Sequence, residues 1–340
     1  MAVNTMIRIQ QASPTVYIIL PVHNRRDVTL RFISCLKRQT FKNYQLILID
    51  DGSKDGTSKA VLDQLPDTAI IRGKGNWWWA GSLQQGYEWL IKHKISADDY
   101  VLIMNDDTEI QEDFLETGLF IMKDHRHTLL TATGYNLTTG QPQDSGGYKF
   151  SWKDLDCYET NEVSEINCLS TRGMFVKVSD FLSIGGFYPR LIPHYLSDLE
   201  FTMRAQERGM NLKIHKDFRI YIDFDKSGYR DFSQETYINF VLKLFSKRSA
   251  MNPIAWMNFI VLRCPRKQKL QTLVRYVKRE FYQLFIARAV PVLKSWTKSI
   301  LPIGVLKKYL SSSVRSIVRL LPDNVIHFLK KSYHRFSSRS

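Results

Sequence analysis

The sequence predicts an α/β fold in which helices cover both faces of a mostly parallel sheet. Short apolar runs alternate with helix-like segments through the first half of the 340-residue chain. Four runs are typical of strands, and two of them end directly in pairs of acidic residues; they cover residues 16–20, 46–49, 69–71 and 100–104. Because strands that are buried on both faces are continuously apolar, these runs indicate a parallel sheet rather than an antiparallel one.

Helical spacing of apolar residues follows each strand-like run. We expect helices over residues 28–38, 57–65, 80–93 and 111–123, the first capped by Asp27. Farther along, the pattern predicts a strand near 129–133, a polar excursion over 135–170, a strand over 174–178 and a helix over 196–208. Alternation of this kind is typical of an open sheet with helices on both faces.

The basic residues are concentrated in the last third of the chain. The whole sequence has a formal net charge of +15. Residues 226–340 contain 23 Lys and Arg residues against four acidic residues, a net charge of +19, whereas residues 1–225 carry −4. This asymmetry indicates an acidic partner surface, either nucleic acid or an anionic membrane face.

Composition and pattern exclude several other classes of protein. Aromatic residues make up 12% of the chain, which argues against wholesale disorder, and 17 Gly and 11 Pro are too few for a fibrous protein. The four cysteines form no CxxC pair, so neither a disulfide framework nor a zinc site is indicated. The first fifteen residues lack a signal-peptide pattern, and no window approaches the roughly 18–20 apolar residues of a membrane span.

Acidic pairs follow two of the predicted strands. Asp50 and Asp51 come after the second run, and Asp106 and Asp107 come after the fourth. Ligands of an open parallel sheet bind outside the carboxyl ends of its strands, so the two pairs are expected to share one site. Carboxylates gathered there repel one another, and a divalent cation held together with substrate phosphates would neutralise them. Either pair alone is also typical of a turn or a helix cap.

The order of several short motifs carries a resemblance to a known family. The strings are Ile19-Leu20-Pro21-Val22-His23-Asn24, Leu48-Ile49-Asp50-Asp51-Gly52-Ser53, Asn105-Asp106-Asp107-Thr108, Gly173-Met174-Phe175, Gly185-Gly186-Phe187 and Ser197-Asp198-Leu199-Glu200. Over roughly residues 15–225 they resemble family 2 glycosyltransferases, of the bacterial polysaccharide and rhamnosyltransferase kind. The resemblance implies the GT-A fold, a Rossmann-like mixed sheet flanked by helices, and inversion at the anomeric carbon.

The resemblance also implies a division of the chain. Residues 15–225 would form the catalytic domain, with a nucleotide-sugar-binding half at 15–134 and an acceptor-binding half at 135–225. Residues 1–14 would be an N-terminal extension, and residues 226–340 a basic helical C-terminal region.

Donor-binding roles are implied for the loops after the first two strands. Asp51 is similar to the family residue that hydrogen-bonds a pyrimidine ring, which implies a UDP- or dTDP-linked sugar. Pro21, His23 and Asn24 stand where the family borders the base and ribose, although tyrosine is common at the position of His23.

The second acidic pair and the tryptophan segment complete the implied donor site. Asp106 resembles the acid next to the ribose, and Asp107 resembles the ligand of Mg²⁺ or Mn²⁺. Trp78, Trp79 and Gly81 resemble a segment that lies beneath the donor sugar. Three consecutive tryptophans cannot all point in one direction, so at least one of them is expected to pack in the core.

Asp198, at the start of the helix predicted over 196–208, is the expected general base. A positioned carboxylate that takes the proton of an attacking hydroxyl contributes typically ~10²–10⁴-fold to the rate. The alternative is that Asp198 only caps the helix. Glu200 is the second candidate for the base, and Arg172, Gly173 and His194 are expected on the acceptor side.

The basic tail suggests where the protein works. Its apolar residues recur three and four apart with Lys and Arg between them, as in 314–321 and 325–336, which suits an anionic membrane surface. A helical appendage packed on the catalytic domain is the alternative. Nucleic acid is not expected as a partner, since no reader motif accompanies the charge. We expect a cytoplasmic protein that is peripheral at the inner face of the cell membrane.

The sequence therefore predicts an inverting hexosyl- or deoxyhexosyltransferase that uses a nucleotide-diphosphate sugar. Its acceptor would be a hydroxyl of a saccharide or lipid-linked saccharide, in the synthesis of cell-surface polysaccharide. A sugar nucleotidyltransferase is the first alternative, but the loop after the first strand, Pro-Val-His-Asn-Arg-Arg, has no glycine to grip a triphosphate. A non-catalytic sugar- or membrane-binding protein is the second, and the presence of Asp51, Asp107 and Asp198 argues against it.

Overall fold

The computed structural model describes residues 13–223, 239 and 243–282. Most of the expected N-terminal extension and the tail segments 314–321 and 325–336 lie outside these ranges. The chain divides into two compact units, residues 1–278 and 279–340. None of the described helices is long and apolar enough to cross a membrane.

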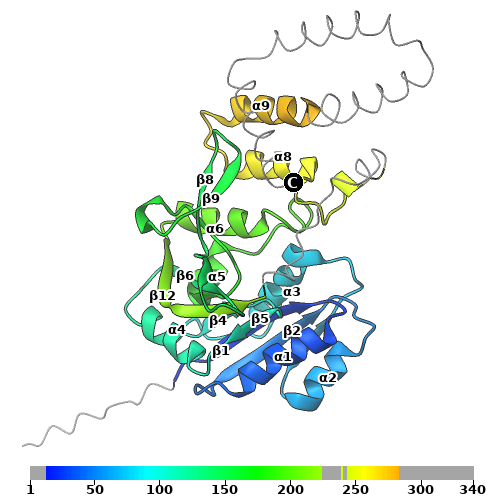
Figure 1. Ribbon diagram of the computed structural model, residues 1–340, viewed down its shortest axis with the longest axis vertical. Helices are drawn as coiled ribbons and strands as arrows, with labels where there is room; N and C mark the ends of the chain where they lie inside the picture. Colours follow the sequence, from blue (N-terminus) through cyan, green and yellow to red (C-terminus); the bar gives the residue numbers. More distant parts are fainter. Residues whose placement is uncertain (1–12, 224–238, 240–242, 283–340) are drawn as a thin grey trace, which may run out of the picture. The chain divides into compact units, whose positions relative to one another are not determined.

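Within the described residues, nine strands form one mixed sheet (Figure 1). Their order across the sheet is β3-β2-β1-β4-β11-β6-β12-β5, and β7 pairs with β6. The strands are β1 (Val16–Val22), β2 (Tyr44–Asp50), β3 (Ala69–Arg72), β4 (Tyr100–Ile103), β5 (Thr108–Ile110), β6 (Thr128–Asn136), β7 (Pro142–Asp144), β11 (Met174–Lys177) and β12 (Asn211–Ile222).

The direction of the strands changes in the middle of the sheet. β3, β2, β1 and β4 run parallel, whereas β11 lies antiparallel between β4 and β6. β12 is parallel to β6 and antiparallel to β5. The parallel half holds the carboxyl ends at which the two acidic pairs were expected, and the antiparallel β11 joins β6, β12 and β5 to it.

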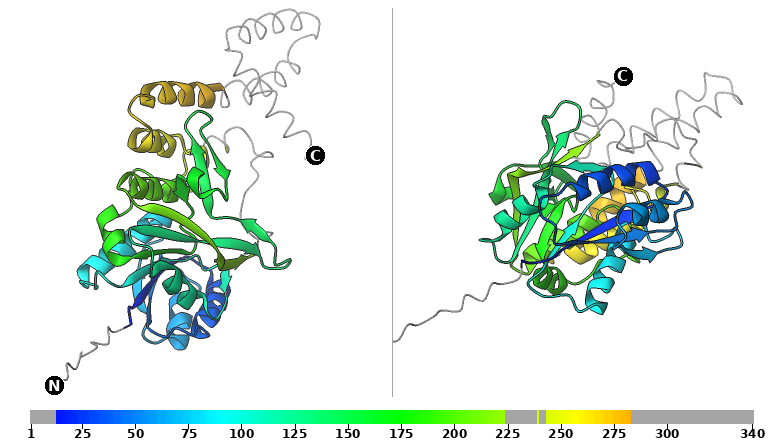
Figure 2. Two further views of the ribbon diagram at one scale, coloured as in Figure 1. Left: turned by 90° about the vertical axis from the view of Figure 1, so that its left-hand side faces the viewer. Right: turned by 90° about the horizontal axis from the view of Figure 1, so that it is seen from below.

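Helices cover both faces of this sheet (Figure 2). Alternate residues of a strand point to opposite faces, and in β1 Ile18 and Leu20 belong to one buried cluster while Ile19 belongs to the other. The first cluster includes side chains of α1 (Arg26–Lys37), α2 (Thr57–Gln64) and α4 (Phe114–Met122). The second includes side chains of α3 (Trp78–Lys92), α5 (Val178–Ile184) and α6 (Ser197–Glu207).

A second, three-stranded sheet occupies part of the predicted excursion. It pairs β8 (Gly147–Ser151) with β9 (Asp156–Glu159) and β10 (Cys168–Leu169), and a short 3₁₀ helix, η1 (Val163–Glu165), precedes β10. Its apolar side packs in a third buried cluster with α6, α8 (Pro253–Arg263) and α9 (Lys269–Phe281). The helices α8 and α9 therefore extend the core beyond residue 225, where the sequence suggested that the catalytic domain ends.

The predicted strands and helices of the first half agree with the structure to within a few residues, but β5 was not expected, and Asp27 lies inside the first turn of α1, whose N-cap position is Arg25. The longest strand, β12, was not expected, because its sequence Asn-Leu-Lys-Ile-His-Lys-Asp-Phe-Arg-Ile-Tyr-Ile mixes charged residues into the apolar pattern. It also changes register between His215 and Arg219. A bulge of this kind breaks the strict period of two on which strand prediction depends.

Candidate active site

The loops after β1 and β2 are tied together by side chains. His23 Nδ1 lies 2.6 Å from the carbonyl oxygen of Asp51, and Asn24 accepts a hydrogen bond from the backbone N–H of Lys54 at 2.7 Å. The backbone N–H of Asn24 donates to Ser53 Oγ at 2.9 Å. Asn24 adopts φ +50°, a left-handed conformation that asparagine tolerates better than most residues. His23 and Asn24 thus shape the loop edge at which the resemblance places a base and ribose, and Pro21 lies within β1 just before them.

Asp51 organises the segment that leads into α3. Its Oδ1 accepts backbone N–H bonds from Gly75 at 2.8 Å and Asn76 at 3.1 Å. Its Oδ2 accepts from Trp77 at 2.8 Å and Trp78 at 3.2 Å. Asp51 is 6% exposed, and four bonds fill the usual accepting capacity of a carboxylate. In this structure Asp51 therefore holds the tryptophan segment in place.

The second acidic pair lies at the end of β4, beside the end of β1. Thr29 of α1 donates to Asp106 Oδ2 at 3.0 Å, and Arg25 bridges the pair with 3.2 Å contacts to Asp106 Oδ1 and Asp107 Oδ2. Burial raises the pKa of Asp106 to about 6, and the positive charge of Arg25 partly opposes that rise. Arg25 neutralises charge that would otherwise accumulate at this edge of the sheet.

One atom of this pair fits a divalent cation. Asp107 Oδ1 is buried and has no hydrogen-bond partner. A carboxylate oxygen of this kind is the ligand that Mg²⁺ or Mn²⁺ takes when substrate phosphates supply much of the remaining coordination. Among the described residues, no group of three or more His, Cys, Asp or Glu side chains is arranged to hold a metal by itself.

The three tryptophans take different positions. Trp77 and Trp79 pack at the border of the second buried cluster, and the indole N–H of Trp79 donates to Thr171 Oγ1 at 3.2 Å. Trp78 has φ +58° and faces His194, with 6.1 Å between ring centroids. Gly81 lies under Trp77, since a Cβ there would stand 3.0 Å from Trp77 Cβ. Trp78 and Trp79 thus contact His194 and Thr171, while Gly81 permits close packing.

Asp198 lies in the first turn of α6 and faces the segment before β11. Burial raises the pKa of Asp198, and hydrogen bonds from Ser197 and Thr171 together with the charge of Arg172 partly oppose the rise. Thr171 therefore stands between Trp79 and Asp198. A carboxylate with a raised pKa in a shielded position is suited to accept a proton.

Two residues expected on the acceptor side, His194 and Arg172, each carry a buried nitrogen without a hydrogen-bond partner. These atoms are His194 Nδ1 and Arg172 Nε. Burial and the charge of Arg248 lower the pKa of His194 to about 4, so its imidazole is neutral near pH 7. Gly173 adopts φ +71°, where glycine is favoured, and its N–H donates to Ile103 O at 3.0 Å. Unpaired buried donors of this kind are suited to contact a bound substrate.

Glu200 occupies a different environment from Asp198. It is 1% exposed and receives two hydrogen bonds from Arg204, at 3.1 and 3.0 Å. Arg263 of α8 adds a third contact at 3.5 Å. Glu200 thus joins α6 to α8 in a buried ion-pair network, and this geometry favours Asp198 over Glu200 as a base.

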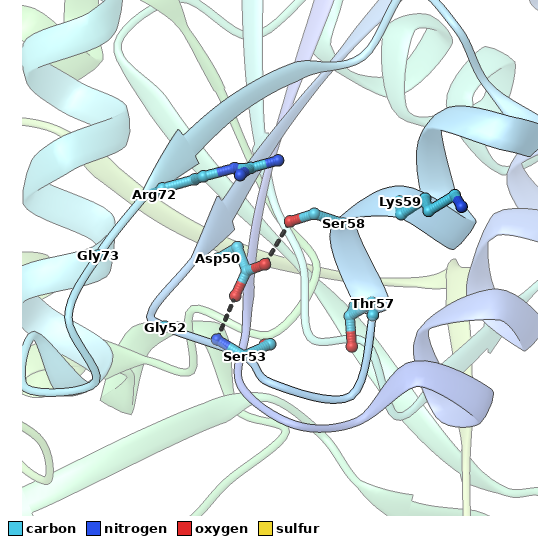
Figure 3. A pocket seen from close by; sticks show the side chains of 9 residues that line it. Asp50, Gly52, Ser53, Thr57, Ser58, Lys59, Arg72 and Gly73 are labelled. Carbon is cyan, nitrogen blue, oxygen red and sulfur yellow. Dashed lines mark hydrogen bonds between the residues drawn. The ribbon is translucent and has the colours of Figure 1, made fainter.

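A cavity of about 260 Å³ lies at the ends of β2 and β3, next to Asp51 (Figure 3). Arg72 extends from the end of β3 toward Ser58, which donates a hydrogen bond to Asp50. Neither Asp106 nor Asp107 lines this cavity, so it is separate from the second acidic pair.

Three residues of the site did not come from the sequence motifs. Arg25 and Thr29 contact the second acidic pair, and Thr171 joins the two halves. Arg25 had one available signal, since it directly follows His23 and Asn24 in the same loop. Thr171 had none, because its role depends on β11 running back beside β4.

The chain is similar in sequence and fold to known glycosyltransferases. The family model described as Glycosyl transferase family 2 matches residues 17–178. An uncharacterized glycosyltransferase of Rickettsia felis is 32% identical over 120 residues, which are 35% of this chain and 20% of that protein. The chain thus spans about a fifth of the length of that relative.

Two solved structures share the fold. The mannosyltransferase PcManGT from Pyrobaculum calidifontis, in complex with GDP-Man and Mn²⁺, matches with a TM-score of 0.50 and 14% identity, over 86% of this chain and 82% of that one. S. aureus TarS in complex with UDP-GlcNAc matches with a TM-score of 0.50 and 14% identity, over 79% and 73%. Over residues 17–178 the chain is thus similar to glycosyl transferase family 2, and the described residues have the GT-A fold.

Proposed function

We propose that the protein transfers a hexosyl or deoxyhexosyl group from a UDP- or dTDP-linked donor to a hydroxyl of a saccharide or lipid-linked saccharide, with inversion. The observation that carries this proposal is the position of Asp198, whose shielded carboxylate faces the donor half through Thr171. The two neighbours that share the fold support a nucleotide-sugar donor, since they were solved with UDP-GlcNAc and GDP-Man.

In the proposed reaction, Asp198 accepts the proton of the acceptor hydroxyl as that oxygen attacks the anomeric carbon. The glycosidic bond to the diphosphate breaks on the opposite face of the sugar, and its electron pair leaves with the nucleotide. The raised pKa of Asp198 makes the carboxylate a better proton acceptor once the acceptor excludes water. Attack and departure on opposite faces account for the inversion.

The donor half holds and orients the nucleotide sugar. We propose that Asp107 ligates Mg²⁺ or Mn²⁺, which stabilises the charge that develops on the leaving diphosphate. Arg25 neutralises Asp106 and Asp107 before the donor enters. His23, Asn24 and the loop fixed by Asp51 would border the nucleoside, with Trp78 and Trp79 beside the sugar.

The assignment of the base is tested by Asp198→Asn. This variant should retain donor binding in calorimetry and lose transfer by ~10²-fold or more, because Asn has no basic oxygen. Glu207→Gln, which removes an exposed carboxylate from the other end of α6, should transfer at the wild-type rate. Wild-type turnover of Asp198→Asn would place the base elsewhere.

The donor is tested by thermal stabilisation. A ligand that binds only the folded state raises its stability, so a panel of UDP-, dTDP- and GDP-linked sugars with Mn²⁺ ranks the donors. Stabilisation by GDP-sugars alone would contradict the pyrimidine assignment. We also propose that the protein works in cell-surface polysaccharide synthesis. It would lie at the inner face of the cell membrane, attached peripherally through residues 226–340.

A further inference from the structure

The helix α9 exposes a line of apolar side chains. Leu270, Val274 and Val277 are 76%, 47% and 52% exposed. They stand at positions i, i+4 and i+7, and because a helix turns about 100° per residue, they lie on one side of it. We call these three residues the α9 stripe.

The fold uses a different side of α9. Thr272 and Tyr276 are buried, and the ring of Tyr276 stacks on Trp256 of α8 with 5.8 Å between centroids. Arg275 donates to the carbonyl oxygen of Lys153, between β8 and β9, at 2.6 Å. Figure 1 shows α9 beside α8. The α9 stripe is therefore held in a fixed orientation by contacts on another side of the same helix.

Positive charge surrounds the α9 stripe. Residues 263–282 contain seven Lys and Arg residues and one acidic residue, Glu280. Arg266, Lys267 and Lys278 are exposed, so their charges are free to reach an anionic surface. An apolar line with flanking basic residues is the pattern of a helix that lies in the headgroup region of a bilayer.

We propose that the α9 stripe and its basic neighbours dock the protein onto an anionic lipid bilayer. The apolar side chains would enter the acyl boundary, and the flanking Lys and Arg would contact lipid phosphates. A protein partner would be expected to present a shaped pocket for these side chains, whereas a bilayer needs only an apolar line and charge. This inference does not depend on the proposed reaction, and it assigns membrane contact to named residues of the compact unit.

The apolar contribution is tested with the full-length protein and matched double variants. Leu270→Glu/Val274→Glu should weaken co-sedimentation with vesicles of phosphatidylcholine and phosphatidylglycerol by roughly tenfold or more, since both side chains leave the acyl boundary. The control Leu137→Glu/Val163→Glu makes the same exchanges at positions that are 40% and 59% exposed in the catalytic part, and it should bind as the wild type.

The charge contribution is tested separately. Lys267→Gln/Lys278→Gln should reduce binding to these vesicles and flatten its dependence on salt, while Lys92→Gln/Lys94→Gln, exposed on and after α3, should not. Binding of the wild type to pure phosphatidylcholine vesicles should be much weaker than to anionic ones.

Two results would overturn the proposal. Unchanged vesicle binding of the Leu270/Val274 variant would show that the stripe does not contact lipid. If binding is unchanged and the Tm is lower, the chain's own residues cover the α9 stripe. If binding is unchanged and sedimentation shows a shift from dimer to monomer, a second copy covers it. Near-UV circular dichroism and donor calorimetry check that each variant is folded, and if the double variant is not, Val277→Gln replaces it. The inference rests on the membrane position proposed above for residues 226–340. Because donor binding is read independently, its failure is distinct from a failure of the proposed glycosyl transfer.

Discussion

Replacing Asp51 by Asn should release the tryptophan segment even when no donor is present. The Asp51 carboxylate accepts hydrogen bonds from Gly75 and Asn76 on one oxygen and from Trp77 and Trp78 on the other. An asparagine side chain offers one carbonyl oxygen and turns its NH₂ group toward the other pair of N–H groups. At least two of the four bonds are therefore lost, and two buried N–H donors lose their partner.

The size of this effect follows from the kind of bond. A hydrogen bond to a charged group contributes about 1.5–3 kcal/mol net, so two of them amount to about 3–6 kcal/mol. The carboxylate also lies at the amino end of α3, where a negative charge adds about 0.3–1 kcal/mol. Since the segment can open locally without unfolding the domain, the lower bound of about 3 kcal/mol is the better expectation, equivalent to roughly a hundredfold.

Hydrogen exchange of the donor-free protein measures this directly. The amides of residues 75–78 should exchange roughly a hundredfold faster in Asp51→Asn, and the emission of Trp77–Trp79 should change. The control is Asp50→Asn, which removes a charge from the same turn. The carboxylate of Asp50 accepts hydrogen bonds from Ser53 and Ser58, so this variant should leave the amides of residues 75–78 protected. If Asp51→Asn kept wild-type exchange and emission and changed only the KM for the donor, Asp51 would be a nucleotide contact and not the anchor of the loop.

Three further substitutions test other contacts of the site. Arg25→Gln should tighten calorimetric binding of Mn²⁺ alone by about fivefold, because a half-exposed ion pair on Asp107 worth up to about 1 kcal/mol no longer competes; weaker binding would contradict this. The stability of His194→Gln should depend less on acid than that of the wild type. The pKa of His194 is lowered to about 4, so between about pH 6.5 and about pH 4 the unfolded wild type binds a proton that the folded protein does not. Urea titrations over this range should show the wild type losing up to about 3 kcal/mol more free energy of unfolding than the variant. Glu200→Gln should lower the free energy of unfolding by about 3–5 kcal/mol, because it leaves Arg204 buried without its carboxylate; an unchanged urea midpoint would contradict this.

The parallel half of the fold was predictable because its strands are buried on both faces. β1, β2 and β4 contain apolar runs, and acidic pairs follow two of them closely, so these features are local in sequence. β12 was not predictable in the same way, because its pairing with β6 holds charged residues such as Lys213 and Arg219 in an extended conformation. The three-stranded sheet was missed for a related reason, since its short strands are stabilised by packing against α6 and α8.

The position of the candidate site was predictable, but the contacts of its side chains were not. Strand order alone indicates that Asp51 and Asp107 lie at one edge of the sheet. It does not indicate that Asp51 saturates its oxygens with backbone N–H groups, because that depends on the path of residues 73–78. Nor does it indicate that Arg25 reaches both acids of the second pair, since the direction of a long side chain is set by its surroundings.

The antiparallel strand β11 explains how one chain assembles a site from two halves. Met174 pairs with Ile103 at the end of β4, and the N–H of Gly173 bonds Ile103 O at 3.0 Å, so the residues just before β11 arrive beside the second acidic pair. Gly173 can make this approach because glycine tolerates φ +71° and has no Cβ. A Cβ at this position would lie 2.7 Å from the Cβ of Ala132. Thr171, two residues earlier, then reaches both Trp79 and Asp198. A parallel strand at this position would enter the sheet from the opposite edge, and its preceding residues would lie far from the carboxylates. The direction of β11 is therefore what brings the candidate base to the donor edge.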